Sequence, residues 1–188
     1  MASAELDELI VADAEALRAW LSANHATSPG VWLALTRKGG TVTTLTWQQA
    51  VDEALCFGWI DGQGRKRDEQ TSSIRFTPRR PRSIWSARNV ANVARLEREG
   101  RMHPAGRAAV EAAQADGRWE RAYPGSADMA VPDDLAAALA AVPGGAEAFA
   151  ALGGTERYAV LWRVHTAATR ETRARRIAAA VASLGAGS

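Results

Sequence analysis

The chain has 188 residues, enough to bury a core in one domain with or without a helical appendage, and a formal net charge of +2. No apolar run approaches the ~20 residues that a membrane-spanning helix needs, and the acidic first twenty residues do not resemble a signal peptide. A single cysteine excludes an internal disulfide and fits a reducing compartment. We therefore expect a cytoplasmic protein without membrane insertion.

The first third of the sequence alternates helical and strand patterns. Apolar residues recur at helical spacing over 13–24, where Asp13 is a suitable N-cap. A short apolar run at 31–35 predicts a buried strand, which ends at the following Lys-Gly-Gly. Thr46 predicts the cap of a second helix over 47–57, terminated by a glycine.

The centre of the chain predicts a pair of strands followed by two helices. The strands cover 59–61 and 73–77 and are joined by a polar loop that contains glycine. Ser83 is expected to cap a helix that runs to residue 99. Pro104 suits the first position of the next helix, which extends to residue 115.

Beyond a loop at 117–131 the pattern becomes wholly helical. Four helices are predicted, over 132–141, 146–152, 155–167 and 170–184. The fold class is therefore α+β, with a small mixed N-terminal part that contains a short sheet and a mostly helical C-terminal part. We place these parts at 1–116 and 117–188, with one compact domain as the alternative.

Positive charge is concentrated in one segment of the chain. Residues 61–107 hold twelve Arg or Lys against five Asp or Glu, a local net charge of +7, whereas residues 1–60 carry −4 and residues 108–188 carry −1. Aromatic residues are interleaved with these cations. Concentrated cations beside aromatic faces are typical of a surface that recognises anions.

This segment supplies the candidate ligand-binding residues. Arginine guanidinium groups match carboxylate and phosphate in two-point contacts, and the helix expected at Ser83 would add free backbone N–H groups. Tryptophans would wall the pocket, while Asp61 and Asn89 would orient the ligand. The candidates are Trp59, Asp61, Lys66, Arg75, Arg79, Arg80, Trp85 and Asn89.

An alternative is equally open for the cations, since they can serve structure instead of a ligand. Arg79, Arg80 and Arg82 then lie in solvent or pair with acidic residues of the N-terminal part. The available acids are Glu5, Asp7, Glu8, Asp52 and Glu53. Asp61 in turn can cap a turn and pair with a neighbouring Arg.

Catalytic and cofactor chemistry has fewer candidates. Asp61 is a candidate acid or base, and Cys56 is a candidate nucleophile, for which a pairing with His165 across the fold stays open. Cys56 lies near a helix C-terminus, which raises a thiol pKa, so a buried structural role is favoured. The three histidines have no metal-ligand spacing, and the glycines form no phosphate-binding loop, so neither a metal nor a cofactor is expected.

The strings ALCFGWIDG at 54–62 and RFTPRRPRSIWSARN at 75–89 resemble the bacterial YdeI/OmpD-associated, or bacteriocin-protection, family. So do EGRM at 99–102, ADGRW at 115–119, YAVLW at 158–162 and ETRARRI at 171–177. The resemblance extends over most of residues 31–180. It implies a link to tolerance of antimicrobial peptides and envelope stress, and it carries over no catalytic residues.

Three functional hypotheses follow. The first is a protective protein that binds an anionic small molecule or carboxylate-bearing peptide through the Arg and Trp cluster. The second is an enzyme that acts on an anionic small molecule through Asp61 or Cys56. The third, nucleic-acid binding, is less favoured, because the overall charge is only +2 and no known nucleic-acid-binding motif is present. The oligomeric state does not follow from the sequence.

Overall fold

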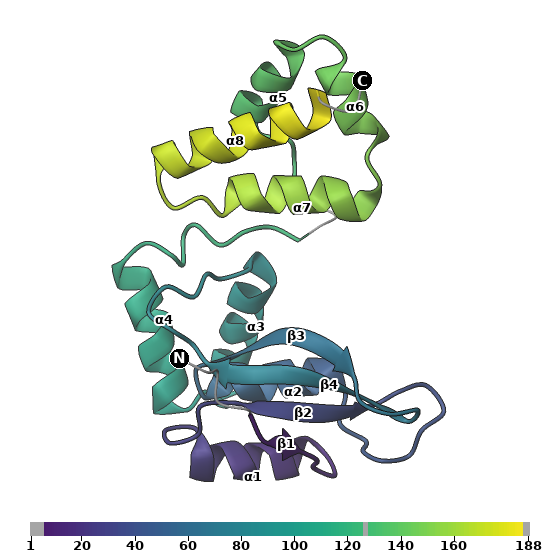
Figure 1. The fold of residues 1–188 in the computed structure, drawn as a ribbon. Coiled ribbons are helices and arrows are strands. Elements are labelled where there is room, and N and C mark those ends of the chain that lie inside the picture. The colour runs from purple at the N-terminus through teal and green to yellow at the C-terminus, as the bar shows by residue number, and fades with distance from the viewer. Residues whose placement is uncertain (1–5, 126–127, 186–188) are drawn as a thin grey trace. The chain divides into compact units, whose positions relative to one another are not determined.

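The computed structural model describes residues 6–125 and 128–185. The chain divides into two compact units (Figure 1). The first unit comprises residues 1–85 and 89–121, and the second comprises residues 86–88 and 122–188. The α+β class predicted from the sequence is confirmed, whereas the division into parts at 1–116 and 117–188 stays a prediction.

A mixed sheet forms the centre of the first unit. Its strands are β1 (Glu8–Leu9), β2 (Val31–Thr36), β3 (Trp59–Lys66) and β4 (Thr71–Pro78), in the spatial order β1-β2-β4-β3. β1 is parallel to β2, and the other pairs are antiparallel. β1 was not predicted, and the hairpin strands β3 and β4 are longer than expected. β3 continues through its glycines because an irregularity between Asp61 and Gly64 accommodates them in the ladder.

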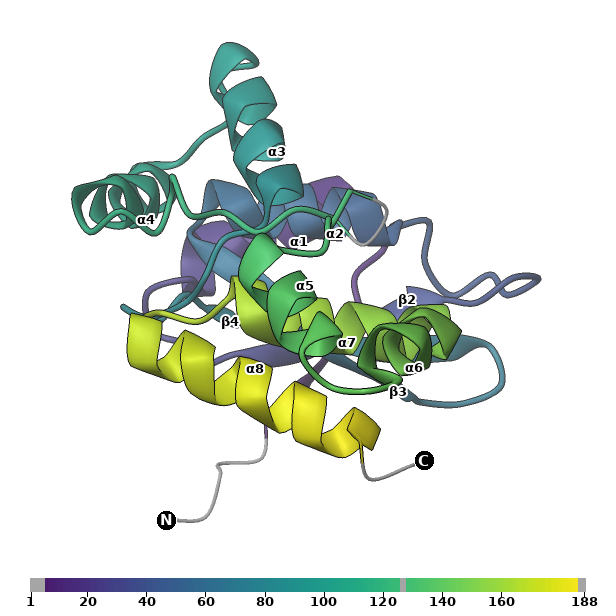
Figure 2. The ribbon, with the colours of Figure 1, turned by 90° about the horizontal axis from the view of Figure 1, so that it is seen from above.

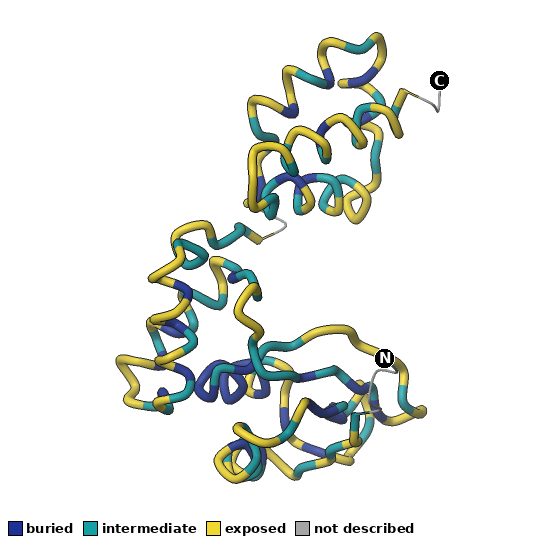
Figure 3. Tube along the Cα trace, turned by 60° about the vertical axis from the view of Figure 1, so that its left-hand side comes forward, coloured by how far each residue is buried: buried dark blue, intermediate teal, exposed yellow. Residues whose placement is uncertain are grey.

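Helices α1 (Ala14–Asn24) and α2 (Trp47–Cys56) pack against one face of this sheet. Leu17 and Leu21 of α1 meet Val31, Leu33 and Phe76 of the strands in the buried core. Almost all of the second half of α2 is buried as well (Figure 3). Both predicted caps are confirmed, since the Asp13 side chain accepts from the backbone of residue 16 and Thr46 forms a capping box.

Helices α3 (Ala87–Arg98) and α4 (Pro104–Ala115) follow the sheet. The helix expected at Ser83 begins instead at Ala87, because the Ser83 hydroxyl accepts from the backbone N–H of Arg80 at 2.9 Å and closes a turn. Pro104 occupies the predicted first position of α4. The prediction that backbone N–H groups at Ser83 open a helix is therefore wrong.

A buried ion-pair network joins the helices of the first unit. The Glu53 carboxylate, 4% exposed, accepts from Arg18 of α1 at 2.8 Å and from Arg101, which follows α3, at 2.5 Å. Its neighbour Asp52 is paired with Arg95 of α3 at 2.6 Å. Removing the partners of a buried charge leaves that charge unpaired, so loss of these arginines is expected to destabilise the first unit.

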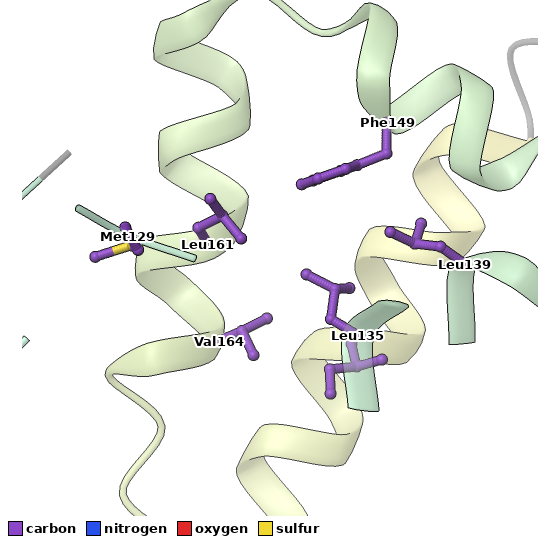
Figure 4. Close-up of a cluster of buried hydrophobic side chains, with 7 residues drawn as sticks. Met129, Leu135, Leu139, Phe149, Leu161 and Val164 are labelled. Atoms are coloured by element: carbon purple, nitrogen blue, oxygen red, sulfur yellow. The ribbon is translucent and has the colours of Figure 1, made fainter. Parts of the chain in front are cut away.

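The second unit is a cluster of four helices, α5 (Asp133–Ala140), α6 (Gly145–Ala151), α7 (Gly154–His165) and α8 (Arg170–Gly185). All four correspond to predicted helices. In Figure 2, α8 runs past α5 and α6. The unit has its own apolar core, part of which is shown in Figure 4. The core residues are Met129, Leu135, Leu139, Phe149, Leu161, Val164 and Ile177.

Tryptophan is unevenly divided between the units. Six of the seven tryptophans belong to the first unit, and Trp162 alone belongs to the second.

In the part of the chain that the structure describes, no helix combines the length and the apolar character that crossing a bilayer requires.

Gly106 of α4 lies against the end of α2. A Cβ at this position would overlap the Cys56 carbonyl oxygen and stand 2.8 Å from the Leu55 oxygen. Gly106→Ala should therefore lower the free energy of unfolding by about 1–3 kcal/mol, although alanine normally stabilises a helix. Gly154→Ala in α7 is the matched control, because its Cβ meets nothing within 4 Å and should be neutral or slightly stabilising. Urea denaturation checks both, and equal behaviour of the two variants would contradict the close packing.

His103 caps α4 and stacks on Phe57, with the ring centroids 4.7 Å apart. Burial, the neighbouring His25 ring and the Arg18 charge lower the pKa of His103 below its ordinary 6.5. Because the folded protein favours the neutral ring, stability should fall as the pH drops below about 6.5 toward the lowered pKa. His103→Asn keeps a capping side chain without a titrating ring and should lose this contribution. The measurement is the urea midpoint at pH 7.5 and 5.5. If the midpoint of His103→Asn falls between these two pH values as much as that of the parent protein, His103 is not the cause of the pH dependence.

Candidate functional site

A cleft of about 580 Å³ lies at one end of the sheet in the first unit. Strands β3 and β4 and the turn after β4 supply most of its walls. The lining residues are Leu6, Pro29, Ile60, Asp61, Gly62, Arg75, Thr77, Pro78, Arg80 and Ser83. The volume falls within the range of small-molecule pockets, and the lining is dominated by polar and charged groups. This cleft is the candidate site.

Arg75 enters the cleft because of its place on β4. Its neighbour Phe76 is buried in the helix-covered core, and side chains alternate along a strand, so Arg75 lies on the opposite face. The guanidinium passes over Gly62, where an added Cβ would be 3.4 Å from Nε. That Nε is buried and has no hydrogen-bond partner in the structure. A buried donor without a partner is costly, so this position favours an acceptor from a ligand.

Asp61 and Arg80 complete the charged lining. Asp61 is half-buried beside the bulge of β3, and Arg80 is exposed in the turn closed by Ser83. Among the described residues, no ion pair joins Asp61 to Arg75 or to Arg80. Thr77 and Ser83 add hydroxyl groups. The guanidinium groups of the cleft are therefore not paired with Asp61, which is the register partner of Phe76 and so starts on the face of the strand pair opposite to Arg75.

The two candidate tryptophans lie in the interior, each 1% exposed, and neither lines the cleft. Trp59 donates from Nε1 to the His25 carbonyl at 3.2 Å and meets Trp20 edge-on. Trp85 packs against Trp119, with ring centroids 4.9 Å apart. This differs from the expectation that they wall a pocket. A large indole stabilises the folded protein more when it is buried in the core than when it faces solvent in a pocket wall.

The remaining candidates also lie away from the cleft lining. The Arg79 guanidinium stacks on the Trp85 ring at 3.5 Å and donates to the Ile84 carbonyl at 3.2 Å, so it fastens the turn after β4. Lys66 is exposed at the far end of β3, and Asn89 belongs to α3. Of the predicted set, the structure brings together Asp61, Arg75 and Arg80.

Much of the predicted basic segment is consumed by ion pairs. Glu8 accepts from Arg65 at 3.0 Å and from Arg67 at 2.9 Å. Asp52 and Glu53 pair with arginines of and beside α3, and Arg107 pairs with Glu97 at 2.9 Å. Glu8, Asp52 and Glu53 therefore pair with arginines other than Arg79, Arg80 and Arg82. Arg80 and Arg82 are exposed, which agrees with the solvent-facing form of the alternative. Glu5 lies outside the described residues.

Sequence reasoning missed several residues of the cleft and its surroundings. Gly62 and Thr77 enter the lining through the register of β3 with β4. Trp32, expected in the core, is half-buried under Arg65, whose guanidinium carbon lies 4.1 Å from the ring centroid. The clue available in the sequence was the pair of glycines after Asp61, which is typical of a bulge near a site.

Cys56 is fully buried at the end of α2, and burial is the main reason that the pKa of its thiol is raised. A buried thiol with a raised pKa is a poor nucleophile. His165 belongs to the second unit, where its Nε2 lies 3.1 Å from the Ala130 carbonyl oxygen. Within residues 6–125 and 128–185, no group of three or more His, Cys, Asp or Glu side chains is arranged to hold a metal ion.

Two family models match the chain. Residues 9–109 match one described as a domain of unknown function (DUF8412), and residues 128–187 match one described as bacteriocin-protection, YdeI or OmpD-associated. The resemblance to the latter family is thus confirmed for the C-terminal region, whereas the central strings at 54–62 and 75–89 fall within the other match. No curated protein and no solved structure matches the chain.

The candidate cleft lies within the first match, apart from Leu6, and the four-helix unit within the second. The first match covers more than half of the 188 residues. The chain therefore belongs to the family of the domain of unknown function DUF8412, and it carries a C-terminal region of the bacteriocin-protection, YdeI or OmpD-associated type.

Proposed function

We propose that the first unit binds a small anionic ligand in the cleft lined by Asp61, Arg75 and Arg80. The observation that carries this proposal is Arg75, which lines the cleft and whose buried Nε has no hydrogen-bond partner in the structure. A carboxylate or phosphate oxygen would satisfy this donor, and the guanidinium fork can bind two oxygens of one anion at once. Arg80 adds a second positive charge at the same opening.

The match of the C-terminal region supports a protective role of the bacteriocin-protection type for the whole chain. In this proposal the first unit supplies ligand recognition. A small anionic molecule or the carboxylate end of a peptide fits the volume and charge of the cleft.

Nucleic-acid binding is less favoured than a small ligand. Affinity for a phosphate backbone grows with the number of cations that are free to contact it. Many of the arginines that gave the segment its +7 charge are paired with Glu8, Asp52, Glu53 and other carboxylates. The cations of the cleft itself are the two arginines Arg75 and Arg80, which suits a small anion better than a polymer.

The direct test is a titration of the isotope-labelled full chain, followed by NMR of the backbone amides. The probes are inorganic phosphate, succinate, malate and aspartate. At least one should shift the amides of Gly62 and Thr77 selectively. Arg75→Gln should weaken that binding by about tenfold or more, because a hydrogen bond to a charged group contributes about 1.5–3 kcal/mol.

Arg82→Gln is the matched control for this titration, since Arg82 is an exposed arginine of the same turn that does not line the cleft. It should leave the affinity unchanged. If no probe shifts the cleft amides, or if Arg75→Gln and Arg82→Gln behave alike, the proposed function is wrong.

The enzyme alternative that uses Cys56 as a nucleophile makes a separate prediction. The buried thiol should react with iodoacetamide roughly a thousandfold more slowly in the native protein than in denaturant, because only the opened fraction of molecules, ~10⁻³ or less, exposes it. Mass spectrometry follows the modification. Rapid alkylation of the native protein at neutral pH would instead mark Cys56 as an accessible, activated thiol.

A further inference from the structure

Two glycines shape the floor of the cleft. A Cβ at Gly62 would stand 3.4 Å from Nε and 3.5 Å from Nη2 of Arg75, so the guanidinium lies over bare backbone of β3. Gly30, which precedes β2, does the same for Thr77, because a Cβ there would stand 2.7 Å from Cγ2 of that threonine. A larger residue at either position would therefore take the space that these β4 side chains occupy.

Thr77 marks the start of an apolar end of the cleft. Side chains alternate along a strand, so Thr77 projects from the same face of the sheet as Arg75, two residues away. Its register partner on β3 is Ile60, whose side chain projects from this face as well. Leu6 approaches from the β2 side, since its Cδ1 lies 3.2 Å from the point where a Gly30 Cβ would stand. Ile60 and Leu6 therefore flank Thr77 on its two sides.

The other apolar lining residues belong to the same end of the sheet. One precedes Gly30 in the sequence, and the other follows Thr77. None of the four apolar side chains is fully buried, so each keeps surface that a ligand can cover. Covering apolar surface is favourable in water, roughly in proportion to its area. The four residues are Leu6, Pro29, Ile60 and Pro78.

The strand geometry sets the distance between the charged and the apolar ends. Arg75 and Thr77 are two residues apart on β4, which corresponds to about 6.6 Å along the strand. A few carbon atoms span this distance. An inorganic anion at Arg75 would leave the surface around Ile60 uncovered, whereas an anion with a short apolar body would cover both. A carboxylate suits the charged end, because its two oxygens match the parallel N–H groups of a guanidinium.

From these observations we infer that the ligand of the cleft is a carboxylic acid with a short aliphatic body. This inference rests on the proposed function. Arg75 binds the carboxylate, with Arg80 adding positive charge at the opening, while Ile60 and Leu6 contact the aliphatic body. Ile60 thereby becomes the specificity-determining residue of the site.

The test compares acetate, isovalerate and isovaleramide. Isovalerate replaces the methyl group of acetate by an isobutyl group, and isovaleramide replaces the carboxylate of isovalerate by a neutral amide. The labelled full chain is titrated with each, and the amides of Gly62 and Thr77 report binding. Isovalerate should bind about tenfold more tightly than acetate, the effect of burying about two methylene groups. Isovaleramide should bind at least about tenfold more weakly than isovalerate, because it lacks the charge that Arg75 recognises.

Three variants test the role of Ile60. In Ile60→Ala most of the apolar contact is lost, so the preference for isovalerate over acetate should fall to about twofold or less. Ile60→Leu keeps an apolar side chain of equal size and should retain the preference. Ile10→Ala is the matched control, because Ile10 is an isoleucine of the first unit that is 47% exposed and does not line the cleft. The amide spectrum of each variant is first compared with that of the parent protein, so that a folding defect is recognised.

The possible outcomes separate the two proposals. If acetate binds in an Arg75-dependent way but isovalerate binds no more tightly, the inference fails and the proposed function stands. A preference that survives in Ile60→Ala overturns the role given to Ile60. If isovaleramide binds as tightly as isovalerate, the charge is not recognised and both proposals fall. If neither these ligands nor inorganic phosphate shifts the cleft amides, the proposed function falls, and the inference falls with it.

Discussion

Strand β4 is paired on both sides, with β2 and with β3, and its side chains must alternate between the two faces of the sheet. This constraint sends Phe76 into the core beneath α1 and α2 and sends Arg75 to the opposite face. A shift of one residue in register would exchange the two, burying a guanidinium in an apolar core. The packing that stabilises the first unit is thus the same packing that positions the arginine of the cleft.

The abundance of arginine is divided between two roles. Arg18, Arg95 and Arg101 neutralise the buried carboxylates of α2, and Arg65 and Arg67 hold Glu8 beside the sheet. Because these carboxylates are already paired with other arginines, they do not neutralise the arginines of the cleft. The basic segment is therefore better understood as a structural scaffold that surrounds a small recognition site than as one continuous cationic surface.

Local signals in the sequence predicted the helices and strands well, whereas contacts between residues far apart in the chain could not be predicted. Asp13 and Thr46 were recognised as caps because a cap depends on residues two or three positions away. Ser83 had the same local pattern, but its hydroxyl is used in a turn, which moves the helix start to Ala87. The sequence named Asp61, Arg75 and Arg80, yet it gave equal weight to Trp59 and Trp85, because burial depends on tertiary packing. Gly62 and Thr77 required the strand register.

The uneven distribution of tryptophan has a spectroscopic consequence. Indole emission will be dominated by the first unit, where six of the seven tryptophans lie and where Trp59 and Trp85 are buried. The helical unit contains one tryptophan, Trp162. Far-ultraviolet circular dichroism, by contrast, weights the helices of both units. A denaturation curve followed by tryptophan fluorescence and one followed by circular dichroism will therefore coincide if the two units unfold together. The two curves will diverge if the units unfold in separate steps.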